Sequence, residues 1–312
     1  MKIIYFGTSA FGIPALDALK KSSHQVLTVV TMPDKPQGRH LKIQPSPVKE
    51  WALENALPLF EFSDINSAES IQRLKDLGAD LFIVISFGVI FSKEFIAIPR
   101  RMTLNVHPSL LPRYRGAAPM PWALINGDKE TGVSIVRVVE KLDAGDILLQ
   151  KKIDILPEDD IVSLEEMLSL VGAEALLESI YLLEKGSAAF ARQDEKRSCY
   201  ARKLTKEDGH IQWAAPASEI RNRVRAMVVW PGSHCFYKGH RIILLETAVS
   251  GSAPVSKSRP GTVIAASRSE GILIATGDAP LKIETLQIEG RKPLSAKEFL
   301  NGFPLEPGQI LE

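Results

Sequence analysis

The fold is decided first by residues 2–31, KIIYFGTSAFGIPALDALKKSSHQVLTVVT, a stretch with the pattern of strand, turn, helix and strand. The apolar segment 2–6 ends at a glycine turn, and Pro14 lies where a short amphipathic helix would begin. The β-branched segment 25–31 then predicts a second strand. Strands that alternate with helices at this spacing predict an open, mostly parallel sheet, and such sheets bind ligands at the carboxyl ends of their strands.

The alternation continues along the N-terminal part of the chain and then gives way to a different pattern. Further strands are predicted at 57–61, 81–85, 103–106, 133–139 and 147–153, and further helices at 47–54, 68–77 and 163–185. After residue 191 the chain becomes polar and charged, and beyond it a helix-like segment at 218–227 precedes five short strand-like segments separated by glycines. We therefore expect an α/β fold with a Rossmann-like catalytic domain at 1–191, a linker at 192–209 and a C-terminal OB-like β-barrel at 210–312.

The composition excludes several classes of protein. The 312 residues, 45% hydrophobic and 24% charged, are typical of a soluble chain with two domains. The net charge of +1 does not predict a polybasic coat, and no apolar run approaches the about 18 residues of a membrane span. The N-terminal segment lacks the features of a signal peptide, and two cysteines are too few for a disulfide framework or a zinc site built on four cysteines. We expect a cytoplasmic monomer that has reduced thiols, binds no metal and does not associate with membranes.

The first glycine-rich loop does not predict a nucleotide cofactor. Residues 7–12, GTSAFG, depart from the dinucleotide pattern G-x-G-x-x-G, and Ile13-Pro14 stands where a Walker loop would carry lysine and a hydroxyl residue. A turn into a helix that begins with proline is the simpler interpretation of both glycines.

Three polar side chains are candidates for catalysis. Asn105 and His107 lie two residues apart on a predicted strand, so both project from the same face, and Pro108 ends the strand behind them. An amide and an imidazole would thus lie at the ligand-binding edge of the sheet. A carboxylate follows in residues 142–146, LDAGD, where small residues permit a tight turn. The spacing does not distinguish Asp143 from Asp146, and for either of them a solvated turn carboxylate is the ordinary alternative.

Residues 105–119, NVHPSLLPRYRGAAP, resemble the formyltransferase family that uses 10-formyltetrahydrofolate, and residues 130–134 and 142–147 fit the same family. Residues 33–39, 44–49 and 200–213 resemble the branch of that family that acts on initiator tRNA, so the resemblance runs from end to end. The resemblance implies that Asn105, His107 and Asp143 form the catalytic set. It implies that the folate site includes Ser109, Leu110, Leu111 and Pro112. The loop after the strand at 81–85 is a second candidate wall for the pterin ring, through Phe87, Gly88, Val89 and Ile90, although Phe87 and Ile90 are equally compatible with an ordinary core.

The activity implied by the resemblance is formyl transfer to the α-amino group of methionine on initiator tRNA. Attack of this amine on the formyl carbon would place negative charge on oxygen, where the Asn105 amide and a protonated His107 would stabilise it. Either His107 or a water polarised by Asp143 would take the proton of the amine and deliver one to the leaving nitrogen, and we expect the water route. The basic residues Arg39 and Lys42, in a loop flanked by glycine and proline, would contact tRNA together with the barrel.

Three alternatives remain open from the sequence. The same catalytic set would serve a formyltransferase that acts on a small amine, such as a ribonucleotide or a nucleotide-sugar. It would also serve a hydrolase of formylated folate. From a different class, the chain could be a non-catalytic RNA-binding module.

Overall fold

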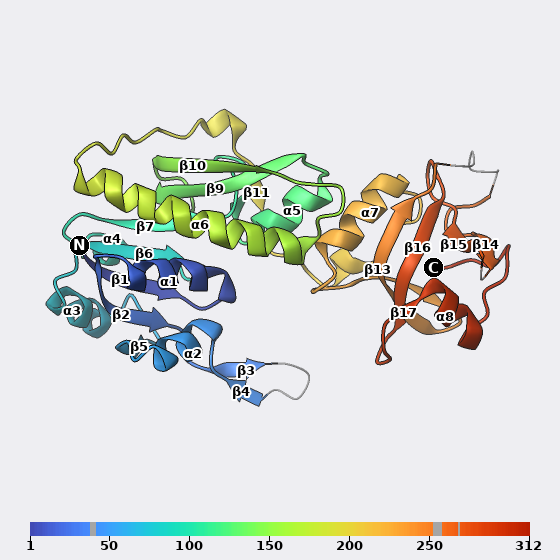
Figure 1. The fold of residues 1–312 in the computed structure, drawn as a ribbon, viewed down its shortest axis with the longest axis horizontal. Helices are drawn as coiled ribbons and strands as arrows, with labels where there is room; N and C mark the ends of the chain where they lie inside the picture. Colours follow the sequence, from blue (N-terminus) through green and yellow to red (C-terminus); the bar gives the residue numbers. More distant parts are fainter. Residues whose placement is uncertain (38–41, 252–257, 268) are drawn as a thin grey trace. The chain divides into compact units, whose positions relative to one another are not determined.

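The computed structural model describes residues 1–37, 42–251, 258–267 and 269–312, and the chain forms two compact units (Figure 1). The first unit contains residues 1–119, 130–154 and 165–202. The second contains residues 203–312 together with two short segments, 120–129 and 155–164. The chain changes unit several times, and for the last time between residues 202 and 203, within the range predicted as a linker. The predicted domain limits at 191 and 210, and the roles assigned to the domains, stay predictions.

The first unit is built on a seven-stranded sheet in the order β10-β9-β7-β6-β1-β2-β5. Its strands are β1 (Lys2–Gly7), β2 (Gln25–Thr31), β5 (Leu59–Glu61), β6 (Leu81–Ile85), β7 (Met102–His107), β9 (Glu130–Arg137) and β10 (Ile147–Asp154). Five of these strands pair in parallel, from β7 to β5, and β9 runs antiparallel to both of its neighbours. The predicted mostly parallel sheet is confirmed. Every residue of β6 is buried, as expected of a strand covered on both faces.

Helices connect these strands, and their first residues show why they begin where they do. The helices are α1 (Ile13–Lys21), α2 (Pro47–Glu54), α3 (Ala68–Asp76), α4 (Lys93–Ile96), α5 (Pro119–Ile125) and α6 (Ile161–Glu184). The hydroxyls of Ser46 and Ser67 accept hydrogen bonds from amides in the first turns of α2 and α3. The helix α6 begins at Ile161, two residues before the predicted start at 163, and the Asp160 carboxylate accepts the amides of Val162 and Ser163 in its first turn.

The second unit contains a six-stranded antiparallel sheet in the order β12-β13-β16-β15-β14, with β17 paired to β16. The strands are β12 (Ser233–Tyr237), β13 (His240–Val249), β14 (Val263–Ser267), β15 (Gly271–Ile274), β16 (Leu281–Ile288) and β17 (Leu294–Ser295). The end of the chain lies against both edges of this sheet. Phe236 of β12 exchanges two backbone hydrogen bonds with Glu312, and Val263 of β14 bonds to Gly308 and Gln309. The C-terminal segment thus joins the two edge strands, as the predicted barrel requires.

Two helices pack on the sheet of this unit, α7 (Ala217–Ala226) and α8 (Ala296–Gly302). The sequence predicted α7 but not α8. The signal for α8 was present, since Ser295 and Glu298 form a capping box at its first turn. No helix among the described residues is both long enough and apolar enough to cross a lipid bilayer.

Candidate active site

The three side chains predicted to be catalytic lie together at the carboxyl end of β7. The Asn105 amide nitrogen Nδ2 donates to Asp143 Oδ1 at 3.3 Å, and His107 Nδ1 lies 3.7 Å from Asp143 Oδ2. Asn105 and His107 share one face of β7, because their backbones pair with Val136 and Ser134 of β9 two residues apart. The carboxylate next to this pair is that of Asp143, so the geometry distinguishes it from Asp146 where the spacing did not.

The turn that carries Asp143 is held in an uncommon conformation. Asp143 has a φ of +50°, in the left-handed region that aspartate tolerates better than most side chains. Its Oδ2 also accepts the backbone N–H of Gly116 at 2.9 Å, so two donors fix the carboxylate. At Gly145 a Cβ atom would stand 1.8 Å from the carbonyl oxygen of Arg137, so this turn requires glycine there.

Both ring nitrogens of His107 face acceptors. The ring is buried, and Nε2 lies 2.9 Å from the backbone carbonyl oxygen of Tyr114. Because a carbonyl only accepts, Nε2 carries a hydrogen, and the second nitrogen, Nδ1, faces the carboxylate of Asp143. Tyr114 itself has a φ of +60°, which costs an aromatic residue on the order of 1–3 kcal/mol and is typical of functional sites.

The predicted folate loop at 109–112 is fixed by hydrogen bonds from two neighbouring strands. The Ser134 hydroxyl donates to Ser109 O at 2.7 Å and accepts the N–H of Leu111 at 3.0 Å, and Gln150 Nε2 donates to Leu111 O at 2.9 Å. The Leu111–Pro112 peptide is cis. The side chains of Ser109 and Leu111 are buried, so the loop presents Leu110 and Pro112, both half-buried, to any ligand.

The second predicted folate segment, 87–90, divides between core and surface. The Phe87 ring is buried in a cluster of aromatic rings, where it stacks on Phe91 with centroids 5.9 Å apart. Its side chain therefore belongs to the core, one of the two interpretations that the sequence allowed. Val89 packs against the same core, whereas Ile90 is 71% exposed. Among the described residues, no atom lies within 4 Å of the position that a Cβ of Gly88 would take.

The two residues predicted to contact tRNA fall at the edge of what the structure describes. Arg39 lies outside the described residues. Lys42 is the first residue of β4 (Lys42–Gln44), which pairs antiparallel with β3 (Lys35–Gln37). The main chain thus forms two short strands on either side of residues 38–41.

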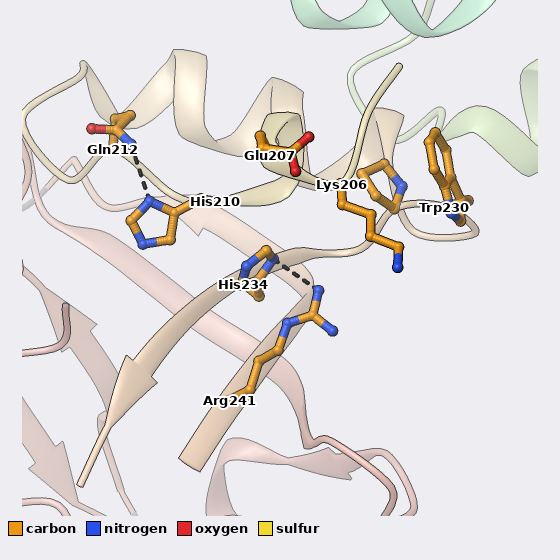
Figure 2. Close-up of a pocket in the computed structure, with 8 residues that line it drawn as sticks. Lys206, Glu207, His210, Gln212, Trp230, His234 and Arg241 are labelled. Carbon is orange, nitrogen blue, oxygen red and sulfur yellow. Dashed lines mark hydrogen bonds between the residues drawn. The ribbon is translucent and has the colours of Figure 1, made fainter. Parts of the chain in front are cut away.

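A second candidate site, not found from the sequence, lies in the second unit (Figure 2). We name it the basic hollow. It has a volume of about 650 Å³ and is lined by Lys206, Glu207, His210, Gln212, Trp230, Pro231, His234 and Arg241. Arg241 points to His234, with the guanidinium 3.1 Å from Nδ1, and Gln212 points to His210 at the same distance (Figure 2). These residues come from three separate segments, so no local pattern in the sequence could have joined them.

The basic hollow combines cationic groups with an exposed aromatic ring. Lys206 and Arg241 are permanent cations, Trp230 is 46% exposed, and Glu207 is the single carboxylate in the lining. Burial lowers the pKa of His234. The nearby carbonyl oxygen of Gly232 acts in the opposite direction, and the positive charge of Arg241 lowers the pKa further. The permanent positive charges in the lining are therefore those of Lys206 and Arg241, and Arg241 also pairs with the carboxylate of Glu289 at 2.5 Å.

Two arginines of α7 are engaged within the second unit itself. Arg221 donates to the carbonyl oxygen of Pro157, and Arg225 donates to those of Leu156 and Asp159 at 3.1 and 3.0 Å. These contacts fix both guanidinium groups on the segment 156–159.

Comparison with known proteins gives two family matches that together span most of the chain. The formyl transferase model matches residues 1–180, and the model of the formyl transferase C-terminal domain matches residues 203–304. The chain is 41% identical over 311 residues to the methionyl-tRNA formyltransferase of Geobacter sulfurreducens, covering 100% of this chain and 96% of that protein. It is 37% identical over 313 residues to the methionyl-tRNA formyltransferase of a Sulfurihydrogenibium species, covering 100% of both.

Solved structures share the fold at much lower identity. HypX from Aquifex aeolicus in complex with tetrahydrofolic acid has a TM-score of 0.65 and 18% identity, covering 100% of this chain and 50% of that one. WlaRD, a sugar 3N-formyl transferase solved with dTDP and 5-N-formyl-THF, has a TM-score of 0.67 and 17% identity, covering 94% and 99%. At these identities the likeness concerns the fold alone.

Proposed function

The chain belongs to the formyl transferase family, and from this we propose that it transfers the formyl group of 10-formyltetrahydrofolate to the α-amino group of methionine on initiator tRNA. The observation that carries the proposal is the convergence of Asn105, His107 and Asp143, with polar atoms 3.3 and 3.7 Å apart, at the carboxyl end of β7. The product, N-formylmethionyl-tRNA, serves initiation of protein synthesis, which takes place in the cytoplasm. Relatives named for this reaction match the chain over its full length.

The formyl donor is consumed as a co-substrate, and the first unit offers surfaces that fit a folate. A pterin ring needs an apolar slot with hydrogen-bonding groups at its edge. Apolar surface is supplied by the exposed Ile90 and the half-buried Leu110, and Gly88 leaves open space beside it. The fixed main chain of 109–112 supplies polar groups. The proposed contribution of Phe87 is limited to its backbone, because its ring is in the core.

The catalytic set acts by stabilising charge. When the amine attacks the formyl carbon, negative charge develops on the formyl oxygen. Asn105 has a second N–H beyond the one given to Asp143, and this group donates to that oxygen. His107 donates from Nδ1, because its contact of 3.7 Å with Asp143 is too long to be a committed hydrogen bond. Asp143, whose side chain is 10% exposed, polarises a water that takes the proton of the amine and returns one to the leaving nitrogen.

We place tRNA contacts at the basic hollow and at Arg39 and Lys42. Cations beside an exposed aromatic ring suit a nucleic acid, because the cations bind phosphate and a base stacks on the ring. Lys206, Arg241 and Trp230 supply these groups in the hollow. A formyltransferase for a small amine has no need of such a surface, so the hollow favours tRNA as acceptor.

The function is tested by formyl transfer from 10-formyltetrahydrofolate to methionyl initiator tRNA, uncharged initiator tRNA and an amino sugar linked to dTDP. We expect transfer to the charged tRNA alone, and loss of turnover in His107→Ala with tRNA affinity retained. Transfer to the amino sugar at an equal or higher rate, or no transfer to the charged tRNA, would refute the proposal.

The basic hollow is tested separately by Arg241→Gln. Loss of one phosphate contact should weaken tRNA binding and reduce the slope of log affinity against log salt by about 0.7–0.9. Lys297→Gln, on the exposed surface of α8, is the matched control and should leave the slope unchanged. Equal slopes in wild type and Arg241→Gln would remove the hollow from the interface.

A further inference from the structure

The segment that follows α6 places a buried glutamine against the catalytic turn. Gln193 is 6% exposed, and its Nε2 donates to the carbonyl oxygens of Asp143 at 2.8 Å and Gly145 at 2.7 Å. Its Oε1 accepts from Nε and Nη2 of Arg115 at 3.0 and 2.8 Å. Both N–H groups and both lone pairs of the side-chain amide therefore have partners. The carbonyl oxygens can only accept and the guanidinium can only donate. The orientation of the amide is fixed by these partners.

The guanidinium of Arg115 is in turn held in its orientation toward Gln193 by a carboxylate. The Arg115 side chain is buried, and two further N–H groups, one on Nη1 and one on Nη2, form a bidentate pair with Glu195 at 3.1 and 2.9 Å. Lys141 donates to the same carboxylate at 2.8 Å. A buried guanidinium is destabilising without a partner, and here Gln193 and Glu195 provide the acceptors.

The residues on either side of Arg115 contact the catalytic side chains directly. Tyr114 O accepts from His107 Nε2, and Gly116 N donates to Asp143 Oδ2. The strand β8 (Arg115–Gly116), which begins directly after Tyr114, pairs with β11 (Tyr200–Ala201) and is thereby anchored in the first unit. The main chain of residues 114–116 therefore contacts His107 and the Asp143 carboxylate, and the side chain of Arg115 acts on the main chain of the Asp143 turn through Gln193.

The turn that carries Asp143 needs a hydrogen-bond donor from outside the sheet, and Gln193 is that donor. The turn connects β9 to β10, and the φ of +50° at Asp143 takes the main chain out of strand geometry. Its carbonyls at 143 and 145 then have to be satisfied by a side chain, because buried carbonyls without a partner are costly. Gln193 satisfies both with one amide group.

We propose that Gln193 is a positioning residue for the transfer step, and that Arg115 and Glu195 orient it. The inference rests on the proposed formyl transfer and adds to it. By fixing the main chain of the Asp143 turn, Gln193 sets the distances from the Asp143 carboxylate to Asn105 and His107. A displacement of about 1 Å at a reacting centre can cost about 100-fold in rate.

The first test compares Gln193→Met and Gln193→Glu in the full-length protein. Met retains the size of the side chain but donates nothing to the turn, so kcat should fall about 10- to 100-fold. The KM values for the folate donor and the charged tRNA should change less than about threefold, because the turn acts on the reacting groups. The Glu variant keeps acceptors for Arg115 but sets a carboxylate against two carbonyl oxygens, so it should be at least as slow. A Glu variant with wild-type kcat would overturn the proposal, since Gln193 would then serve Arg115 alone.

Gln72→Met, the same change on the exposed face of α3, is the matched control and should retain wild-type kcat. The variants at the buried Gln193 could fail to fold, so Glu195→Gln provides a second test at a residue that is half exposed. Its kcat should fall by a smaller factor than in Gln193→Met, again without a change in KM. A rise in KM with kcat unchanged, in either variant, would contradict a positioning role.

The decisive measurement is a double-mutant cycle with Asp143→Asn. If Gln193 acts through the Asp143 carboxylate, Gln193→Met should cost less than about threefold in kcat once that carboxylate is gone. A purely structural role would give the same fold loss in both backgrounds, and that result would overturn the inference while leaving the proposed function intact. Wild-type protein without formyl transfer would overturn the proposed function, and this inference with it.

Discussion

Replacement of Asn105 by alanine should slow formyl transfer by about 10²–10³ while leaving the fold nearly as stable as before. The rate effect follows from loss of one donor to the developing negative charge, which costs about 2.7–4 kcal/mol of barrier. The stability effect is small because the hydrogen bond from Asn105 to Asp143 is 3.3 Å long, beyond the 2.7–3.2 Å of ordinary N–H···O bonds. Its loss should therefore cost about 1 kcal/mol, or about 2–4 °C in Tm.

The assay is single-turnover transfer from 10-formyltetrahydrofolate to methionyl initiator tRNA, with enzyme in excess, since this isolates the chemical step from product release. Thr103→Val is the matched control. It removes a buried hydroxyl from the same face of β7, two residues before Asn105, where the hydroxyl bonds only weakly to Ile96 O at 3.4 Å. The control should keep the wild-type rate. A transfer rate for Asn105→Ala within about threefold of wild type would refute the assignment of Asn105 as a charge-stabilising donor.

Two further predictions concern ionisation. The hydrogen bond from Arg115, followed by that from Lys141, lowers the pKa of Glu195 from 4.5 to about 2, so its stabilising contribution is present above pH 4.5 and is lost as the pH falls towards 2. The difference in Tm between wild type and Glu195→Gln should narrow over this range, and a constant difference would contradict the pairing. Burial raises the pKa of the Cys235 thiol to about 12, whereas Cys199 is exposed, so iodoacetamide at pH 8 should label Cys199 alone in the folded protein and both thiols in urea. Peptide mapping by mass spectrometry checks this, and native labelling of Cys235 would contradict it.

The sheet of the first unit could be predicted because its strands carry their signal locally. Residues 25–31 and 81–85 are runs of β-branched and apolar residues bounded by polar or glycine-containing turns, and both strands were predicted with the limits that the structure has. Runs of this kind arise where helices cover both faces of a parallel sheet. Strands were also predicted in the second unit from their glycine boundaries, five of them where the structure has six, and the additional β17 is only two residues long.

The placement of Asn105 and His107 was predictable for a related reason. Alternation along a strand puts residues i and i+2 on one face whatever the rest of the fold does. The meeting of this pair with Asp143 was not fixed by any local rule, because it depends on the pairing of β7 with β9 and on the turn after β9. The spacing alone left Asp143 and Asp146 equal, because nothing in the sequence LDAGD assigns the left-handed conformation to Asp143.

Residues that contribute to the active site but lie outside the motif at 105–119 are harder to predict from the sequence. For Phe87 the residue pattern was equally compatible with a core position and a ligand contact, and the stacking of its ring on Phe91 depends on the tertiary structure. Gln193 lies 50 residues from Asp143, in a polar segment that was predicted to be a linker. Its partners on the catalytic turn are main-chain carbonyls, which every residue possesses, so no pattern of residue types marks the contact.

The effects of substitutions at Gln193 and Glu195 are easily misjudged from the sequence. A change at Gln193 or Glu195 would be taken as a change in a solvated linker and expected to be neutral. The buried amide at 193 and the bidentate pair at 195 give the opposite expectation, because they determine the main-chain position of a turn whose carboxylate lies 3.7 Å from the imidazole of His107. Substitutions in the segment 193–195 should therefore slow the transfer step, although this segment shares no strand or helix with the motif at 105–119. The hydrogen bonds between the two segments, and not their separation in the sequence, cause this effect.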